Sequence, residues 1–297
     1  MDQNRVAVVG AGAVGCYFGG MLARAGIPVT LVGRAVHVDA IAARGIFLEG
    51  VRVNQHIPVA ATTSLEGVRD AEIVLLCVKT PDTETTAREI RPHLNSGAAL
   101  VSMQNGVDNV RRIRAASGIE AIPAVVYVAA AMAGPGHVRH SGRGDLVLPD
   151  SAAALAAIFE PAGVPCRLSP AIETELWRKM VLNCAYNAIS ALGRAQYGAM
   201  LRSPRIRELM RRAIGETVAV AHADGVALSV EEMVEAARKL GDSMSAATSS
   251  TAQDLARGKG TEIESLNGYI ARRGAEAGIP TPVNETLCAL VRLLEQA

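Results

Sequence analysis

The chain has 297 residues, of which 49% are hydrophobic and 20% are charged. Its 30 basic and 29 acidic residues give a net charge of +1, which argues against a nucleic-acid partner and against binding to an anionic membrane surface. No apolar run approaches the ~20 residues that a membrane-spanning helix needs. The five cysteines are widely spaced and form no CxxC pair, as is typical of reduced thiols. We therefore expect a soluble cytoplasmic protein, and the chain length favours two domains.

The first predicted elements are a strand, a glycine-rich turn, a helix and a second strand within residues 5–34. Gly10, Gly12 and Gly15 have the G-x-G-x-x-G spacing of a dinucleotide-binding turn. In such a turn the first glycine permits a tight bend, the second lets the backbone approach a pyrophosphate, and the third lets helix and strand pack closely. The flanking strand and helix favour nucleotide binding over the alternative, a glycine-rich turn in an unrelated α/β protein.

The residue at the end of the second strand distinguishes between nicotinamide cofactors. An acidic residue there would bind the ribose 2′-hydroxyl of NAD and would repel a 2′-phosphate. In this chain Gly33 takes that position and Arg34 follows it, and a guanidinium is suited to a phosphate. We therefore predict NADPH as the cofactor.

Two further predicted strands end in polar residues. The first, in residues 70–80, ends near Lys79, and the second, in residues 97–109, ends near Gln104 and Asn105. Doubly wound sheets bind their ligands at the carboxyl ends of the strands, so Lys79 and Asn105 are candidates to contact cofactor or substrate. Each also has a purely structural interpretation, as a lysine extending from a strand end and as part of an Asn-Gly turn.

The chain continues with strands in residues 121–148 and a helix in residues 151–162. His137 and His140 lie on a predicted strand with no acidic or sulfur ligand beside them, so we predict no metal site. The basic run around Arg112 lacks interleaved aromatic residues and is predicted to be a solvated helix face.

Strand patterns stop near residue 170, where the predicted organisation of the chain changes. We expect residues 1–169 to form an NADP-binding Rossmann-type domain, an α/β unit with a doubly wound sheet. Residues 170–297 are expected to form an all-α substrate and catalytic domain. A nucleotide domain followed by a helical one usually has its active site in the cleft between them.

The second half contains a row of polar residues in an otherwise apolar helix. Lys179, Asn183 and Asn187 follow one another at intervals of four residues within residues 176–189. Four residues advance a helix by about 40° and about 6 Å, so the three side chains share a narrow arc beside the apolar face. We call this row the polar ladder. It is either the solvated edge of an amphipathic helix or a set of functional groups at the edge of a core.

Residues 260–282 are predicted to form another helix, with Thr261 as its N-cap. Glu264, three residues after Thr261, fits a capping box, and this structural role accounts for it. Glu262 has no such role. It is either an acid favoured by the helix dipole or a partner for Lys179.

Several of these segments are shared, in the same order, with one known family. They are the glycine-rich turn, "VK" at 78–79, "QNG" at 104–106, "PGHVRHSGRG" at 135–144, "LWRKMVLNCAYNAISAL" at 176–192 and "TSS…QD…GTEIESLNGYI" at 248–270. Together they resemble ketopantoate reductase, also called 2-dehydropantoate 2-reductase, over essentially the whole chain. The resemblance implies an NADPH-dependent reduction of 2-dehydropantoate to pantoate in pantothenate and coenzyme A biosynthesis. From the same resemblance we expect a homodimer.

The resemblance also implies roles for individual residues. The catalytic lysine of the family corresponds to Lys179 and its active-site glutamate to Glu262. Its substrate-binding residues correspond to Asn183, Asn187 and Ser250, and its cleft residues near nicotinamide and substrate to Lys79 and Asn105.

These residue types suit the reduction of a ketone. Hydride transfer leaves negative charge on the carbonyl oxygen, which must be protonated or held by a positive donor, and the Lys179 ammonium can do both. A nearby Glu262 would favour the charged lysine, while neutral amides can orient the reactants without cancelling that charge. Two other functions stay open: a paralogue that acts on another branched 2-oxo or hydroxy acid, and a non-enzymatic NADPH-sensing protein.

Overall fold

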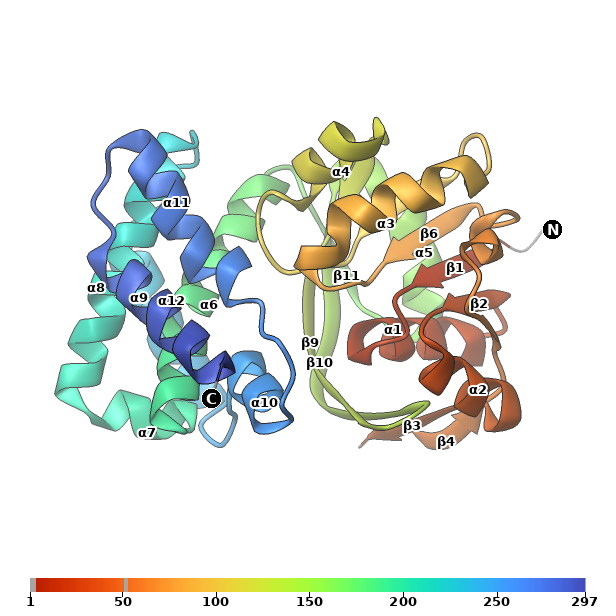
Figure 1. Ribbon diagram of the computed structural model, residues 1–297, viewed down its shortest axis with the longest axis horizontal. Coiled ribbons are helices and arrows are strands. Elements are labelled where there is room, and N and C mark those ends of the chain that lie inside the picture. The colour runs from red at the N-terminus through yellow and green to blue at the C-terminus, as the bar shows by residue number, and fades with distance from the viewer. Residues whose placement is uncertain (1–3, 51–52, 297) are drawn as a thin grey trace. The chain divides into compact units, whose positions relative to one another are not determined.

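The computed structural model describes residues 4–50 and 53–296. The chain divides into two compact units, Met1–Ile172 and Glu173–Ala297 (Figure 1). The boundary expected between residues 169 and 170 lies just before this division.

The first unit is built on a six-stranded parallel sheet with the strand order β5-β2-β1-β6-β7-β8. The strands are β1 (Val6–Val9), β2 (Val29–Val32), β5 (Ala60–Thr62), β6 (Ile73–Leu76), β7 (Ala99–Ser102) and β8 (Ala121–Pro123). The chain first builds the sheet outward on one side of β1, with β2 and then β5. It then builds outward on the other side, with β6, β7 and β8. Such a reversal is the point at which doubly wound sheets bind ligands. The predicted α/β fold is therefore confirmed.

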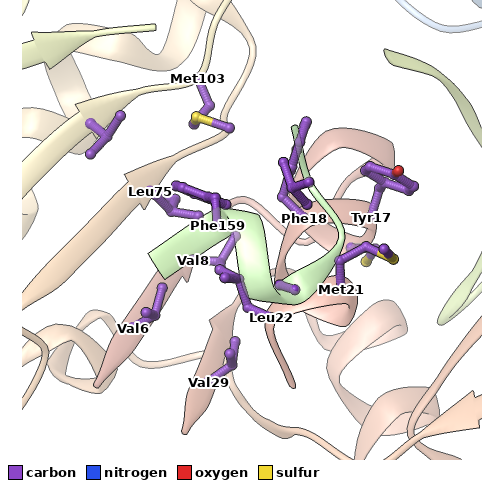
Figure 2. Packing of buried hydrophobic residues seen from close by; sticks show 14 of the residues in the cluster. Val6, Val8, Tyr17, Phe18, Met21, Leu22, Val29, Leu75, Met103 and Phe159 are labelled. Atoms are coloured by element: carbon purple, nitrogen blue, oxygen red, sulfur yellow. The ribbon is translucent and has the colours of Figure 1, made fainter. Parts of the chain in front are cut away.

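Apolar side chains of the parallel sheet alternate between two cores, as buried strands require. Val8 and Leu75 face a core that also contains helices α1 (Ala13–Arg24) and α5 (Ala153–Phe159). Figure 2 shows Phe18 and Leu22 of α1 near Phe159 of α5, and the two phenylalanine rings meet edge to face at 6.3 Å. The other face packs against α3 (Thr83–Ile90) and α4 (Asn109–Ser117), while α2 (Ala35–Arg44) follows β2.

A second sheet completes the first unit, with the order β11-β10-β3-β4 and β9 paired to β10. Its strands are β3 (Ile46–Gly50), β4 (Asn54–Ile57), β9 (Val125–Gly134), β10 (His137–Pro149) and β11 (Cys166–Ser169). His137 and His140 lie on β10, where their Nε2 atoms contact Glu49 Oε2 at 2.6 Å and the Arg143 oxygen at 2.7 Å. Within residues 4–50 and 53–296, no group of three or more histidine, cysteine, aspartate or glutamate residues is arranged to hold a metal ion.

The second unit is helical, as predicted. Its helices are α6 (Ile172–Gly193), α7 (Tyr197–Arg202), α8 (Pro204–Ala223), α9 (Val230–Ser243), α10 (Ser250–Ala256), α11 (Asn267–Ala277) and α12 (Pro282–Glu295) (Figure 1). Its core includes the apolar face of α6, with Trp177, Met180, Val181 and Cys184 buried. Among the described helices of both units, none is long and apolar enough to cross a bilayer.

The predicted helix start at Thr261 is wrong. A short 3₁₀ turn covers Ile263–Ser265, and α11 begins only at Asn267, because Leu266 (φ −112°, ψ −102°) interrupts the helical path. The Thr261 hydroxyl accepts a hydrogen bond from the Ile263 N–H at 3.2 Å, so it closes a local turn.

The capping box predicted for Glu264 is also wrong. Its carboxylate accepts hydrogen bonds from Arg292 at 2.6 Å and Arg272 at 2.8 Å. Two guanidinium groups bind a carboxylate more strongly than one backbone N–H does. The hydrogen bond from Arg292 holds the pKa of Glu264 below its ordinary value.

Candidate active site

The glycine-rich turn joins β1 to α1 in a shape that only glycine permits at two positions. Gly10 has a φ of +111°, and a Cβ built on it would lie 2.7 Å from the carbonyl carbon of Cys77. A Cβ on Gly15 would lie 2.1 Å from the Gly10 oxygen, so this glycine allows α1 to pack close to β1. At Gly12, by contrast, no described atom beyond its chain neighbours would lie within 4 Å of such a Cβ. The turn therefore offers open space at the N-terminus of α1, which fits a bound pyrophosphate.

The end of β2 accommodates no side chain at Gly33. A Cβ there would lie 2.5 Å from the Cβ of Ala11, so the acidic residue typical of NAD sites would clash. Arg34 follows as the N-cap residue of α2 and is exposed. The exposed side chain at this strand end is therefore the cationic one of Arg34.

Lys79 and Asn105 follow neighbouring strands, β6 and β7. Lys79 is exposed and Asn105 is half-buried. The backbone oxygen of Asn105 accepts hydrogen bonds from the Thr80 hydroxyl at 3.1 Å and from Asn109 Nδ2 at 2.7 Å. The two strand ends are thereby tied to each other and to α4.

A buried amide beneath these strand ends was not predicted as part of the site. Gln104 is 5% exposed, and its Nε2 donates to the Val78 oxygen at 3.1 Å and to the Thr83 hydroxyl at 2.7 Å. Its Oε1 accepts from the Ser102 hydroxyl at 3.0 Å. Gln104 therefore fixes the backbone directly before Lys79.

The prediction that Arg112 lies on a solvated helix face is wrong. Its side chain is 24% exposed and donates to both carboxylate oxygens of Glu84, at 2.6 and 2.7 Å. It also donates to the Thr80 oxygen at 3.1 Å. This fork keeps the pKa of Glu84 below its ordinary value, chiefly through the hydrogen bond itself. Arg112 thus joins α4 to the turn that follows Lys79.

The polar ladder on α6 runs from the edge of the second unit into its interior. Lys179 and Asn183 are half-buried, and Asn187 is only 4% exposed. The backbone oxygen of Asn187 accepts a hydrogen bond from the Ser249 hydroxyl at 3.0 Å. A solvated edge does not account for a buried Asn187.

Ser250 is exposed at the first position of α10, and its neighbour Ser249 is the buried residue. Ser249 is 1% exposed and caps α10 by accepting from the Ala252 N–H at 3.1 Å. Its own N–H donates to the Ser190 hydroxyl at 3.2 Å. Ser249 therefore fixes the start of α10, and with it Ser250, beside the buried end of the polar ladder.

Glu262 is half-buried and immediately precedes the 3₁₀ turn, where its backbone oxygen accepts from the Ser265 N–H at 2.9 Å. It lies in the same unit as Lys179. The helix that follows the Glu262 turn, α11, contacts α6 through the side chains of Tyr269 and Asn267. The rings of Trp177 and Tyr269 lie 6.2 Å apart, and Asn267 Nδ2 donates to the Cys184 oxygen at 3.2 Å.

A parallel sheet with this glycine turn at its reversal point, followed by a helical unit, defines a dinucleotide-binding protein of the Rossmann type. Comparison with known families is more specific. Residues 6–153 match the family described as ketopantoate reductase PanE/ApbA, and residues 171–295 match the C-terminal part of the same family. The chain belongs to the ketopantoate reductase family, and it is an oxidoreductase.

Individual relatives cover the chain almost completely. A protein of Halobacterium salinarum named 2-dehydropantoate 2-reductase is 34% identical over 98% of this chain and 99% of its own. The crystal structure of a PanE/ApbA family ketopantoate reductase from Ralstonia eutropha JMP134 is 49% identical, with a TM-score of 0.93 over 98% of both chains. A D-mandelate dehydrogenase, solved with NADH, shares the fold at 23% identity, with a TM-score of 0.92 over 98% of both chains.

Proposed function

We propose that this chain reduces 2-dehydropantoate to pantoate with NADPH, and that Lys179 is the proton donor. The observation that carries this proposal is the polar ladder, which leads from Lys179 into the protein interior in a chain that matches the ketopantoate reductase family from end to end.

The first unit binds the nucleotide in this proposal. Gly10, Gly12 and Gly15 form the turn for the pyrophosphate. The clash expected for any side chain at Gly33, followed by the exposed Arg34, favours a 2′-phosphate over a bare ribose. The bound cofactor supplies a hydride.

The second unit supplies the proton. The ammonium of Lys179 donates to the carbonyl oxygen as negative charge develops there. Glu262 supports the charged lysine and accepts a hydrogen bond from a substrate hydroxyl. A carboxylate near an ammonium favours its protonated form, which is the form that an acid catalyst needs in the reducing direction.

The remaining site residues orient the substrate. Asn183 and Asn187 present neutral amides beside the lysine, so they can hold a ketone or hydroxyl without competing for the proton. Ser250 binds the substrate carboxylate. Lys79 and Asn105, at the ends of β6 and β7, contact cofactor and substrate.

The direct test is steady-state oxidation of NADPH with 2-dehydropantoate and a panel of related branched 2-oxo acids. We expect kcat/KM to be highest for 2-dehydropantoate. A higher value for another 2-oxo acid would reassign the substrate and leave the chemistry intact. Nucleotide binding without turnover of any ketoacid would instead support a sensor and contradict the proposal.

The proposal also includes a cytoplasmic location and a homodimer. The described structure contains the five cysteines as free thiols, which suits a reducing compartment. Sedimentation equilibrium of the purified chain measures the oligomeric state.

A further inference from the structure

Two buried asparagines connect four helices of the second unit. Asn267 and Asn284 are both 0% exposed. Asn267 Nδ2 donates to the Cys184 oxygen on α6 at 3.2 Å and to Asn284 Oδ1 on α12 at 2.9 Å. Asn284 Nδ2 donates in turn to Glu216 Oε2 at 2.8 Å and to the Ala213 oxygen at 3.2 Å, both on α8. The connection thus runs from α6 through the first residue of α11 to α12 and α8.

The far end of this connection is anchored by a helix cap. Glu216 accepts hydrogen bonds from the N–H groups of Val283 and Asn284, at 2.8 and 2.9 Å, in the first turn of α12. A carboxylate at a helix N-terminus satisfies exposed donors and interacts favourably with the helix dipole. The side chain of Asn284 is therefore held in one orientation, with its oxygen available to Asn267.

Asn267 is a costly choice for a purely structural position. Its Oδ1 has no hydrogen-bond partner among the described residues, so burial leaves this acceptor unsatisfied. An apolar side chain of similar size would avoid that cost. Apolar contacts are not directional, however, whereas a hydrogen bond to one particular carbonyl specifies how far along α6 the start of α11 lies.

The position of α11 along α6 affects the proposed site, because Lys179 lies on α6 and Glu262 lies shortly before α11. Cys184 lies five positions after Lys179 on α6, and Asn267 lies five positions after Glu262. Five residues of α6 span about 7.5 Å, and Glu262 is separated from Asn267 only by the 3₁₀ turn and Leu266, so the Asn267 bond is close to both groups along the chain. The ring contact of Trp177 with Tyr269 joins the same two helices. Trp177 precedes Lys179 in the sequence, whereas Cys184 follows it.

We propose that Asn267 is a positioning residue, which sets the distance between the Glu262 carboxylate and the Lys179 ammonium through its hydrogen bond to the Cys184 oxygen. This inference rests on the proposed function, because it assumes that Glu262 and Lys179 act together. It assigns Asn267 no contact with substrate.

A double-mutant cycle separates positioning from simple destabilisation. In the wild-type background, Asn267→Leu is expected to lower kcat with 2-dehydropantoate about tenfold and to leave the KM for NADPH unchanged, since misplaced catalytic groups chiefly affect turnover. In the Glu262→Ala background the same substitution is expected to lower kcat less than about twofold, because the group to be positioned is already absent.

Tyr186→Phe is the matched control. It removes another buried hydrogen bond of α6, from the Tyr186 hydroxyl to the Ala237 oxygen at 2.7 Å. That bond leads to α9, which carries no proposed site residue. We expect kcat to change less than about twofold.

Equal losses of kcat from Asn267→Leu in both backgrounds would overturn the inference, and so would unchanged kcat in the wild-type background. In either case an impaired Glu262→Ala would leave the proposed function standing. Wild-type turnover in Glu262→Ala would overturn both the inference and the role of Glu262. If Asn267→Leu does not fold, Asn267→Ala replaces it in the same cycle, since a smaller side chain cannot clash.

Discussion

The two units hold their candidate site residues in different ways. In the first unit, Lys79 and Asn105 follow adjacent parallel strands, so the backbone ladder of the sheet fixes their spacing. In the second unit, Lys179 and Glu262 lie on a helix and on a turn more than eighty positions later. No backbone ladder joins helices, so side chains such as Asn267 must provide the directional contacts. A sheet aligns functional residues through its main chain, whereas a helical unit relies on buried polar side chains to do so.

The largest effect on stability is expected in the glycine-rich turn between β1 and α1. Gly15→Ala places a Cβ 2.1 Å from the Gly10 oxygen, so α1 must move away from β1. We expect a loss of about 3 kcal/mol or more in the free energy of unfolding, measured by urea denaturation.

Gly12→Ala is its control, because the new Cβ meets no described atom within 4 Å beyond its chain neighbours. We expect unchanged stability but at least about tenfold weaker NADPH binding, since the methyl group occupies space that the pyrophosphate needs. Unaltered affinity for NADPH would show that the phosphates do not approach this turn.

A smaller effect, on the KM for NADPH, is expected at Arg34, the residue proposed to select NADPH over NADH. Arg34→Ala removes the cation at the start of α2 and should raise the KM for NADPH about tenfold while changing the KM for NADH little. Arg44→Ala removes the same charge at the far end of α2 and serves as control. Equal changes for both cofactors would contradict a 2′-phosphate contact.

The smallest effect concerns the ion pair beneath Lys79. The pKa of Glu84 in the folded protein lies below the ordinary value of 4.5, so its contribution to stability is complete above pH 4.5 and is lost as the pH falls through the folded value. Arg112→Ala should remove this contribution, about 1 kcal/mol after allowance for solvent screening.

Urea denaturation between pH 7 and pH 3 measures this difference. The stability of Arg112→Ala should approach that of the wild type as the medium becomes acidic, while exposed Arg111→Ala should follow the wild type throughout. A constant difference at every pH would mean that Arg112 acts only through its contact with Thr80.

The same contrast explains what the sequence could predict. Strands β1, β2, β6 and β7 and the glycine turn follow from local apolar runs and fixed spacings, and they lie where they were predicted. Strands β3, β4, β5 and β11 were not predicted. The polar ladder was visible because its residues repeat every four positions on one helix. The capping box at Glu264 was mispredicted because Glu264 binds Arg292, a residue distant in sequence, which no local pattern reveals.

The supporting residues were missed for the same reason. Asn267 and Asn284 bond to residues up to 83 positions away, and Gln104 bonds to a hydroxyl 21 positions away. The only available signal was an amide within an apolar segment, as Asn267 is between Leu266 and Ile270. Buried amides in helices are usually hydrogen-bonded, as Asn267 is to the Cys184 oxygen.

Steady-state kinetics of Lys179→Ala with saturating NADPH and 2-dehydropantoate test whether Lys179 donates the proton. We expect kcat to fall at least about 100-fold, while the Kd for NADPH, measured by fluorescence titration, stays within about twofold of the wild-type value. Turnover close to that of the wild type, in a folded variant, would contradict the assignment of Lys179 as the acid.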